Sequence, residues 1–476
     1  MEQARTPLYT QLLLHNEKQS ISLHVPGHKN GINLPKEYAN KFGEILKLDV
    51  TELTDLDDLH FPEGVILESQ QLLAKLYGVK KSFFLVNGST VGNLAMILSV
   101  IAENDQLLVQ RNCHKSIING LQLAKANPIF LSPEYDEDWR VAGGISLETV
   151  EMAIRRYPDV KAILLTYPTY YGMVYDLKKI IQLAHTHGIP VLVDEAHGAH
   201  FIAGAPFPPS AVALEADVVV QSAHKTLPAL TMGSFLHINS DRVSIEAIKK
   251  NLQLLQSSSP SYPIMASLDV ARSYLGTFTA EDKEILQEQV SIFRRALSSI
   301  SGIKVLSYPE NQGDALKVTI QSTSLLTGFE LQKRLEKVGV YSEMADPVNV
   351  LMVLPLLKLN QTFPFEEIIN RIGLALDDIT SVEQREIRSL IQKVKISKLE
   401  LSYIEIQKRV QIKVDLAEAV GSIAAEMITP YPPGIPLLFP GEIITIEDIA
   451  TINELINLGA RFQGGDTLKE GMIYIY

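Results

Sequence analysis

The alternation of short apolar runs with amphipathic segments between about residues 80 and 240 limits the possible folds more than any other feature of this sequence. The apolar runs have the length of buried strands, at residues 82–86, 105–110, 128–131, 161–166, 191–196 and 217–222. The amphipathic segments have helical spacing, at residues 91–104, 146–157 and 176–188. Continuous apolar strands that alternate with helices predict an α/β fold whose mostly parallel sheet is covered on both faces.

The length of 476 residues predicts more than one domain, because a single core rarely grows beyond about 300 residues. A long helix is expected at 262–276, and a charge-rich stretch at 380–413 is typical of a linker or a surface helix. Other elements expected after residue 290 are strands at 315–322 and 348–355 and helices at 327–339, from 364 and at 415–428. We therefore expect an N-terminal segment, a major domain, a small α/β domain and a C-terminal domain, at residues 1–60, 61–275, 276–380 and 381–476.

Charge and composition exclude several classes of protein. A net charge of −12 argues against nucleic-acid binding through a basic surface. Cys113 is the only cysteine, so no internal disulfide can form, which favours a reducing compartment. The first 20 residues lack the pattern of a secretion signal, and no apolar run reaches the ~18 residues of a membrane span. We expect a cytoplasmic protein with no nucleic-acid partner and no membrane partner.

Lys225 closes a buried strand within the sequence Ser-Ala-His-Lys. Folds with parallel sheets build their sites at the carboxyl ends of the strands. An aldehyde cofactor requires a lysine amine that can lose its proton, and partial burial at a strand end favours this loss. The alternative is an ordinary surface lysine that follows a strand.

Asp194 ends another buried strand, and a carboxylate there can pair with a protonated pyridine nitrogen. Ala196 lies two residues further on the same side of the strand and can pack beneath a flat ring. The alternative is a capping or ion-paired aspartate. Asp194 and Lys225 together indicate pyridoxal phosphate far more specifically than either residue alone.

Two further motifs fit a cofactor site. Ser89 and Thr90 lie between a strand and a helix, where hydroxyl and free N–H groups can hold a phosphate. An ordinary helix cap explains the same residues. His114 follows another predicted strand, and its imidazole can stack on a cofactor ring; the alternative is a solvated basic turn.

No metal site is expected. His24 and His28 are four residues apart, but the Pro-Gly pair between them prevents a regular helix. His197 and His200 lack further ligands nearby in the sequence. Residues 194–197 spell the Asp-Glu-Ala-His box of helicases, but the chain has no phosphate loop of the form G-x-x-x-x-G-K-[ST] to accompany it.

Six motifs carry a resemblance to a known family: HVPGHKNG, NGSTVGN, QRNCHKS, LVDEAHGAHF, VQSAHKTLPALTMGS and PYPPGIPLLFPGE. In this order they resemble the motifs of the bacterial ornithine/lysine/arginine decarboxylases, from about residue 5 to the C-terminus. The resemblance implies the aspartate-aminotransferase-like fold of pyridoxal-phosphate-dependent transferases, with a smaller α+β domain and a C-terminal domain. The chain is similar to the shorter members, which lack an N-terminal receiver-like domain.

The resemblance implies a role for each motif residue. Lys225 would hold the cofactor as a Schiff base, Asp194 would bind the pyridine nitrogen and His114 would stack on the ring. His197 would lie near the phenolic oxygen, which completes the catalytic set. The implied cofactor-binding set is Ser89, Thr90, His114, Asp194, Ala196, His197, Ser222, His224 and Lys225. Larger members often read G-T-S-T at the phosphate loop, so the N–H of Val91 would replace one hydroxyl.

The implied reaction is decarboxylation of lysine, arginine or ornithine to CO₂ and an amine that serves polyamine biosynthesis. Glu442 is the first candidate for the carboxylate that meets the distal cation of the substrate, and Glu426 is the second. Other pocket-lining candidates are Thr169, Tyr170 and His28. The family also implies a homodimer or higher homo-oligomer with shared active sites, to which residues 257–263 would contribute.

Two alternatives differ in function. One is an aminotransferase, or another pyridoxal-phosphate lyase, on the same fold. An aminotransferase would need an arginine such as Arg371 for the substrate's α-carboxylate. The other is a non-catalytic protein that binds the cofactor or an amino acid. The products separate the three functions: a decarboxylase releases CO₂, an aminotransferase forms a keto acid, and a non-catalytic protein forms neither.

Overall fold

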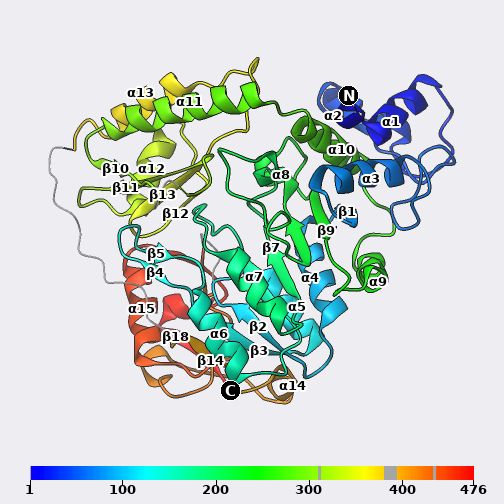
Figure 1. The fold of residues 1–476 in the computed structure, drawn as a ribbon. Helices are drawn as coiled ribbons and strands as arrows, with labels where there is room; N and C mark the ends of the chain where they lie inside the picture. The colour runs from blue at the N-terminus through cyan, green and yellow to red at the C-terminus, as the bar shows by residue number, and fades with distance from the viewer. Residues whose placement is uncertain (1, 309–311, 380–393, 432–435) are drawn as a thin grey trace. The chain divides into compact units, whose positions relative to one another are not determined.

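The computed structural model describes residues 2–308, 312–379, 394–431 and 436–476 (Figure 1). The chain forms two compact units, each assembled from separate segments. The first unit comprises Met1–Val100, Pro190–Ala205 and Pro209–Thr279. The second unit comprises Ile101–Ile189, Pro206–Pro208 and Ala280–Tyr476. The four consecutive domains expected from the sequence stay a prediction, and the expected linker at 380–413 lies partly outside the described residues.

The first unit contains four strands in the order β1-β9-β8-β7. Their bounds are β1 Lys81–Leu85, β9 Ser234–Ile238, β8 Val218–Gln221 and β7 Val191–Asp194. β7 and β8 are parallel, whereas β9 is antiparallel to both β8 and β1. The strands predicted at 82–86, 191–196 and 217–222 are confirmed. β9 was not predicted, since the fully buried His237 interrupts its apolar pattern.

Helices of the first unit are α1 Pro7–Glu17, α2 Lys36–Leu46, α3 Val65–Tyr77, α4 Gly88–Val100, α8 Ala223–Thr226, α9 Ile245–Leu255 and α10 Tyr262–Gly276. The prediction at 262–276 is confirmed. Helix α4 packs closely on the sheet because Gly92 has no side chain. A Cβ atom there would lie 2.7 Å from Val220 Cγ1 and 2.8 Å from Leu85 Cδ1. The close approach brings the start of α4 to the strand ends.

Four further strands in the second unit have the order β6-β2-β3-β14, with bounds β6 Ile163–Thr166, β2 Gln106–Gln110, β3 Asn127–Leu131 and β14 Ile396–Lys398. β6, β2 and β3 are parallel, and β14 is antiparallel to β3. The associated helices are α5 Lys115–Ala124, α6 Leu147–Arg156 and α7 Leu177–Thr186. Side chains of Ser146 and Asp176 cap α6 and α7, close to the predicted starts.

A separate antiparallel sheet of the second unit has the order β10-β11-β13-β12. Its strands are β10 Ile303–Val305, β11 Lys317–Ser322, β13 Asn349–Val353 and β12 Met344–Ala345. The helices are α11 Ala280–Ser298, α12 Gly328–Lys337 and α13 Phe365–Ala375. A hairpin joins β4 Tyr135–Asp136 and β5 Val141–Ala142. The elements predicted between 315 and 375 are confirmed.

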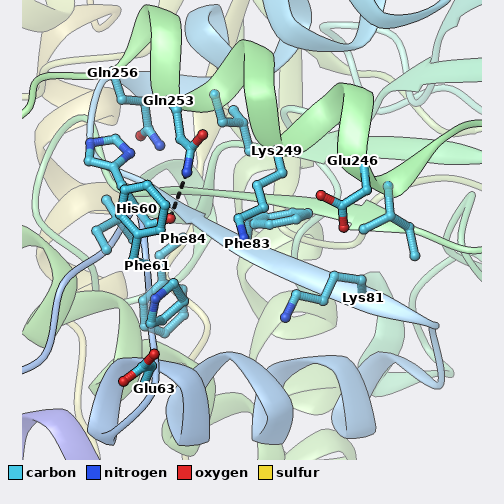
Figure 2. Close-up of a pocket in the computed structure, with 14 residues that line it drawn as sticks. His60, Phe61, Glu63, Lys81, Phe83, Phe84, Glu246, Lys249, Gln253 and Gln256 are labelled. Atoms are coloured by element: carbon cyan, nitrogen blue, oxygen red, sulfur yellow. Dashed lines mark hydrogen bonds between the residues drawn. The ribbon is translucent and has the colours of Figure 1, made fainter.

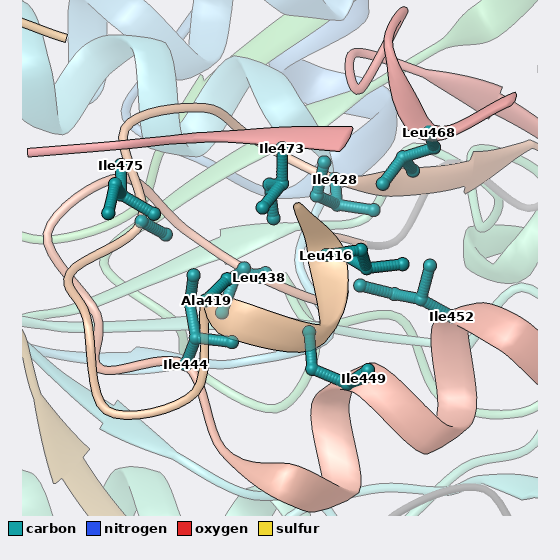
Figure 3. Close-up of a cluster of buried hydrophobic side chains, with 11 residues drawn as sticks. Leu416, Ala419, Ile428, Leu438, Ile444, Ile449, Ile452, Leu468, Ile473 and Ile475 are labelled. Carbon is teal, nitrogen blue, oxygen red and sulfur yellow. The ribbon is translucent and has the colours of Figure 1, made fainter. Parts of the chain in front are cut away.

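Apolar side chains between residues 414 and 475 form a small core (Figure 3). The helices and strands described from residue 403 onward are α14 Tyr403–Ile406, β15 Ile412–Asp415, β16 Thr429–Tyr431, α15 Ile446–Asn457, β17 Arg461–Gln463 and β18 Met472–Ile475. Figure 3 shows Leu416, Ile428 and Ile473 gathered in one cluster with Ile452 of α15. The core therefore draws on side chains from several separate segments.

The helix predicted at 415–428 is wrong. Only Leu416–Glu418 forms a turn of 3-10 helix, and Gly421 has φ of +84°. The next residues are extended: Ala424 N–H donates to the Glu442 carbonyl oxygen, and Ala425 N–H donates to that of Tyr474. Pairing with distant segments thus overrides a helix-like apolar pattern. Among the described residues, no helix combines the length and apolarity that crossing a membrane requires.

Candidate cofactor site

The strand ends of β7 and β8 in the first unit carry the two residues that the sequence singles out. Asp194 is the last residue of β7 and is in register with Val220 of the parallel strand β8. Lys225 lies in the short helix α8, which begins directly after Ser222. Because the two strands are parallel neighbours, both residues lie at the same edge of the sheet.

The Asp194 carboxylate is 2% exposed and is held by two donors. Its Oδ2 accepts a hydrogen bond from Asn93 Nδ2 at 3.0 Å, and its Oδ1 accepts one from Ala196 N–H at 3.1 Å. Sequence reasoning did not identify Asn93. The sequence pattern that could have identified Asn93 is its spacing of four residues from Ser89, which puts both side chains on one face of α4.

Lys225 Nζ lies 3.0 Å from Nε2 of His197, whose ring is 6% exposed. When the lysine is protonated, it offers only N–H donors, and Nε2 of a neutral His197 then accepts this bond. His197 follows Asp194 by three residues, so the turn after β7 presents both groups. This pair can hold and exchange a proton at the lysine nitrogen.

Hydroxyl groups gather where α4 begins. Ser222 Oγ donates to Ser89 Oγ at 2.7 Å, and the Thr90 side chain is exposed. Gly88 has φ of +76°, and its N–H donates to the Met232 carbonyl oxygen. The first N–H groups of a 13-residue helix have no partner within the helix, so they favour an anion.

Two hydrogen bonds to one carbonyl oxygen fix His224 close to the start of α4. Its Nδ1 donates to the Gly233 carbonyl oxygen at 3.0 Å, and its N–H donates to the same oxygen at 3.2 Å. The Nδ1 proton leaves Nε2 of the ring as an acceptor when the histidine is neutral.

These groups together fit pyridoxal phosphate. A buried carboxylate matches a protonated ring nitrogen, a lysine amine matches an aldehyde, and a helix start with two hydroxyls matches a phosphate. All of them lie in the first unit. Of the implied cofactor-binding set, only His114 belongs to the second unit.

His114 caps α5 in the second unit. Its Nδ1 accepts the N–H of Ser116 at 3.2 Å and lies 2.8 Å from Ser116 Oγ. This geometry fixes the plane of the imidazole relative to α5. The neighbouring Cys113 is completely buried. Stacking of His114 on a cofactor ring stays a prediction.

The predicted pocket residues Thr169 and Tyr170 lie in a tight turn of the second unit. Thr169 N–H donates to the Met173 carbonyl oxygen at 3.0 Å, and Thr169 Oγ1 accepts from Met173 N–H at 3.2 Å. Lys317 Nζ donates to the carbonyl oxygen of Tyr170. The Tyr170 side chain packs against the cluster that contains Trp139. These hydrogen bonds and this packing therefore hold the turn rigidly.

Glu442 forms a buried ion pair with Arg111, and each side chain is 8% exposed. Arg111 Nη1 and Nη2 donate to the two carboxylate oxygens at 2.5 and 2.8 Å, and Phe439 N–H donates to Oε2 at 3.0 Å. The guanidinium carbon lies 4.6 Å from the centre of the Phe439 ring. Both carboxylate oxygens of Glu442 form hydrogen bonds within the fold. The geometry therefore gives no support to the predicted contact between Glu442 and the substrate.

Glu426 and His28 also have partners within their own units. Glu426 accepts the N–H of Gly465 and of Tyr474, each at 2.9 Å, which ties together the small C-terminal core. His28 Nε2 lies 3.1 Å from Asp49 Oδ2. Both contacts have a structural explanation, and the predicted substrate roles of Glu426 and His28 stay predictions.

A cleft of about 290 Å³ lies between β1 and α9 in the first unit (Figure 2). Its lining includes His60, Lys81 and Lys249, and Gln253 Nε2 donates to the His60 carbonyl oxygen at 2.8 Å. Gln256 Oε1 accepts the N–H of Val86, two residues before the start of α4, at 2.9 Å. The lining includes none of the predicted cofactor residues. Within the described ranges, no group of three or more His, Cys, Asp or Glu side chains could hold a metal.

Comparison with known proteins identifies the family. A model of the "Orn/Lys/Arg decarboxylase, major domain" matches residues 6–323, and one of the "Orn/Lys/Arg decarboxylase, C-terminal domain" matches residues 383–465. The uncharacterized protein YaaO of Bacillus subtilis is 45% identical over 482 residues, which cover 99% of this chain and 98% of that protein. The arginine decarboxylase of the same organism is 34% identical over 490 residues, covering 100% and 98%.

Solved structures show the same fold. The constitutive lysine decarboxylase of Escherichia coli superposes with a TM-score of 0.80 at 20% identity, covering 99% of this chain and 82% of that one. The serine palmitoyltransferase of Sphingomonas wittichii gives a TM-score of 0.54 at 18% identity, covering 72% and 82%. These neighbours confirm the predicted aspartate-aminotransferase-like fold. The chain therefore belongs to the Orn/Lys/Arg decarboxylase family, whose members use pyridoxal phosphate to remove CO₂ from a basic amino acid.

Proposed function

We propose that this decarboxylase acts on arginine, at a site built around Asp194 and Lys225. The observation that carries the site is the juxtaposition of a buried carboxylate and a histidine-paired lysine at the ends of parallel strands. Arginine is favoured because relatives from Bacillus subtilis and Bacillus anthracis, 34% and 32% identical, are named arginine decarboxylases. Relatives named lysine decarboxylases are 25% identical or less.

Pyridoxal phosphate supplies an aldehyde that condenses with amines and a ring that accepts electrons from the bond to the departing carboxylate. Asp194 binds the ring nitrogen and keeps it protonated, because Asn93 and the Ala196 N–H fix the carboxylate in place. Its burial strengthens this interaction by excluding water.

Lys225 has two tasks in this proposal. Its nitrogen holds the cofactor between reactions, and it returns a proton to the substrate carbon after CO₂ has left. His197 accepts a hydrogen bond from Lys225 Nζ and thereby orients it. Proton transfer requires donor and acceptor within hydrogen-bond reach, and this pair, 3.0 Å apart, fulfils that condition.

The phosphate is assigned to the N-terminus of α4. Ser89, Ser222 and Thr90 provide hydroxyls, the protonated imidazole of His224 provides an Nε2–H donor, and the N–H of Val91 replaces the hydroxyl that larger relatives have. His114 is assigned to the face of the ring, with Ala196 beneath the opposite face. Thr169 and Tyr170 remain the proposed lining of the substrate pocket.

The test is a substrate panel with the purified, cofactor-loaded protein. Arginine, lysine and ornithine, each labelled at the carboxylate, are compared for release of labelled CO₂. We expect arginine to have the highest kcat/KM. Lys225→Ala should lose both the visible absorbance of the bound cofactor and CO₂ release, whereas Lys249→Ala, at a surface lysine of the same unit, should retain both. Full activity of Lys225→Ala would remove the site assignment.

The described residues give the aminotransferase alternative no support. Arg371 Nη1 donates to the Val338 carbonyl oxygen at 2.9 Å, and Nη2 donates to Glu367, so its guanidinium is engaged within the fold. Formation of a keto acid from arginine in the same panel would revive this alternative. Normal cofactor absorbance with no product of either kind would support a non-catalytic protein.

We further propose a cytoplasmic homodimer, or a higher homo-oligomer, that supplies an amine for polyamine biosynthesis. The single, buried cysteine fits a reducing compartment. Shared active sites are a property of the family, and residues 257–263 are the segment proposed to contribute to the neighbouring subunit. Sedimentation of the loaded enzyme, with and without replacement of this segment, tests the assembly.

A further inference from the structure

Glu195, next to Asp194, has no role in the reaction as proposed, yet it is completely buried. Its Oε2 accepts from Ser210 Oγ at 2.7 Å and from Gln221 Nε2 at 2.6 Å, while its Oε1 accepts from Ala211 N–H at 2.6 Å. A carboxylate is costly to bury, even with three donors. The contacts of this side chain indicate which part of the site it supports.

The hydrogen bonds continue from Gln221 across the sheet. Gln221 Oε1 lies 3.1 Å from His237 Nε2, and His237 Nδ1 lies 2.8 Å from Ser82 Oγ. Because the Gln221 amide donates to Glu195, its oxygen must accept from His237, which puts the imidazole proton on Nε2. Ser82, Gln221 and His237 are each 0% exposed. The chain of bonds thus has one direction, from Ser82 to Glu195.

The turn that carries His197 rests on the Glu195 side chain. Gly198 N–H donates to the Glu195 carbonyl oxygen at 2.9 Å, and a Cβ atom at Gly198 would lie 2.7 Å from Glu195 Cγ. Tyr77 holds the other side of the turn: its hydroxyl donates to the Ala199 carbonyl oxygen at 2.6 Å, and its ring stacks on His237 at 4.1 Å. The position of the turn therefore depends on the position of the Glu195 side chain.

We propose that Glu195 is a positioning residue for the reaction. Its contacts with Ser210, Ala211 and Gln221 fix the turn after β7 and so hold His197 against Lys225. This inference rests on the proposed function of Lys225, but it concerns the geometry of His197, which can be measured without substrate.

Three variants of the full-length enzyme separate positioning from bulk stability. Glu195→Met removes both acceptor oxygens, and with them all three hydrogen bonds, at similar side-chain length. Glu195→Gln is the conservative variant, because its amide can donate to Ser210 and to a reversed Gln221. Asp217→Leu is the matched control: Asp217 is also completely buried and accepts Val191 N–H at 2.7 Å, at the opposite end of the same strands.

The first readout is the side-chain signal of His197 in protein labelled with ¹⁵N-histidine, recorded with and without cofactor. Glu195→Met should shift this signal, while Asp217→Leu should lower the melting temperature but leave the signal in place. Glu195→Gln should retain the signal and move the His237 proton from Nε2 to Nδ1, since Gln221 must reverse. An unshifted His197 signal in Glu195→Met, or an equal shift in Asp217→Leu, would overturn the proposal.

The second readout is CO₂ release. Displacement of His197 should lower kcat roughly 10- to 100-fold in Glu195→Met with KM changed less than about threefold, and Glu195→Gln should restore most of it. If Glu195→Met does not fold, Ser210→Ala removes a single donor and should shift the His197 signal in the same direction; no shift would count against the proposal. If no basic amino acid is decarboxylated, the proposed function fails, while the His197 signal still decides the role of Glu195.

Discussion

Two buried carboxylates, Asp194 in the first unit and Glu442 in the second, have different kinds of partner. Asp194 is held by neutral donors, an amide side chain and a backbone N–H. Glu442 is held by the guanidinium of Arg111 through two hydrogen bonds. Burial alone therefore does not reveal the role of a carboxylate. In the proposed function, Asp194 presents its charge to the cationic ring of the cofactor, whereas the charge of Glu442 is already neutralised by Arg111.

The comparison predicts its largest effect for Asp194→Asn. This variant keeps the shape of the side chain but loses the charge that stabilises the protonated ring. We expect the rate of CO₂ release to fall about 10²- to 10³-fold, which corresponds to roughly 3–4 kcal/mol. The cofactor should still bind, as its absorbance would report. An unchanged rate would show that the charge of Asp194 does not stabilise the ring as it accepts electrons.

Arg111→Met should act on stability instead. The substitution leaves Glu442 buried without its cation, so we expect the free energy of unfolding to fall by about 3–5 kcal/mol in urea titrations. The double variant Arg111→Met/Glu442→Leu should recover much of the loss, because neither charge remains buried. A loss of CO₂ release by the folded single variant with no loss of stability would instead make Glu442 a substrate residue.

Glu195 makes the stability of the first unit depend on pH. Burial is the largest influence on its carboxyl group and raises the pKa from 4.5 to about 8, although bonds from Ala211, Gln221 and Ser210 oppose the rise. The folded chain therefore holds a proton that the unfolded chain has released between these pH values, so this contribution to stability is lost as pH rises from about 4.5 to 8.

The variant Glu195→Gln cannot titrate and should remove this slope. As pH rises from 5 to 8.5, we expect the free energy of unfolding of the variant to increase by more than about 1 kcal/mol relative to that of the unsubstituted chain. One pKa unit corresponds to about 1.4 kcal/mol. Urea unfolding at several pH values measures the difference. Parallel curves for the two proteins would show that Glu195 is ionised throughout.

Asn93→Ala should have the smallest effect. It removes one of the two donors to Asp194, and a hydrogen bond to a charged group contributes about 1.5–3 kcal/mol. We expect CO₂ release to fall roughly tenfold. Asn251→Ala is the control, because Asn251 Nδ2 also forms hydrogen bonds, to Ser99 Oγ and the Ala247 carbonyl oxygen, but on α9. Equal losses in both variants would point to general loosening of the unit.

The sequence predicted those features that depend on local pattern. Asp194 and Lys225 were recognisable because each follows a continuous apolar run, and parallel strands bring such ends to one edge. Asn93 and the chain of bonds to Glu195 could not be predicted, because they depend on which side chains face each other across α4 and the sheet. The helix expected at 415–428 failed for the same reason: its residues pair with segments that follow later in the chain.

The ion pair of Arg111 and Glu442 spans 331 residues of sequence, which has a consequence for synthesis of the protein. At about 5–20 residues per second, a ribosome needs roughly 20 to 60 s to reach Glu442 after Arg111 has been added. During this interval the end of β2 carries a cation without its partner. The ion pair can therefore form only after Glu442 has been added, so the two segments that it joins stay unlinked throughout this interval.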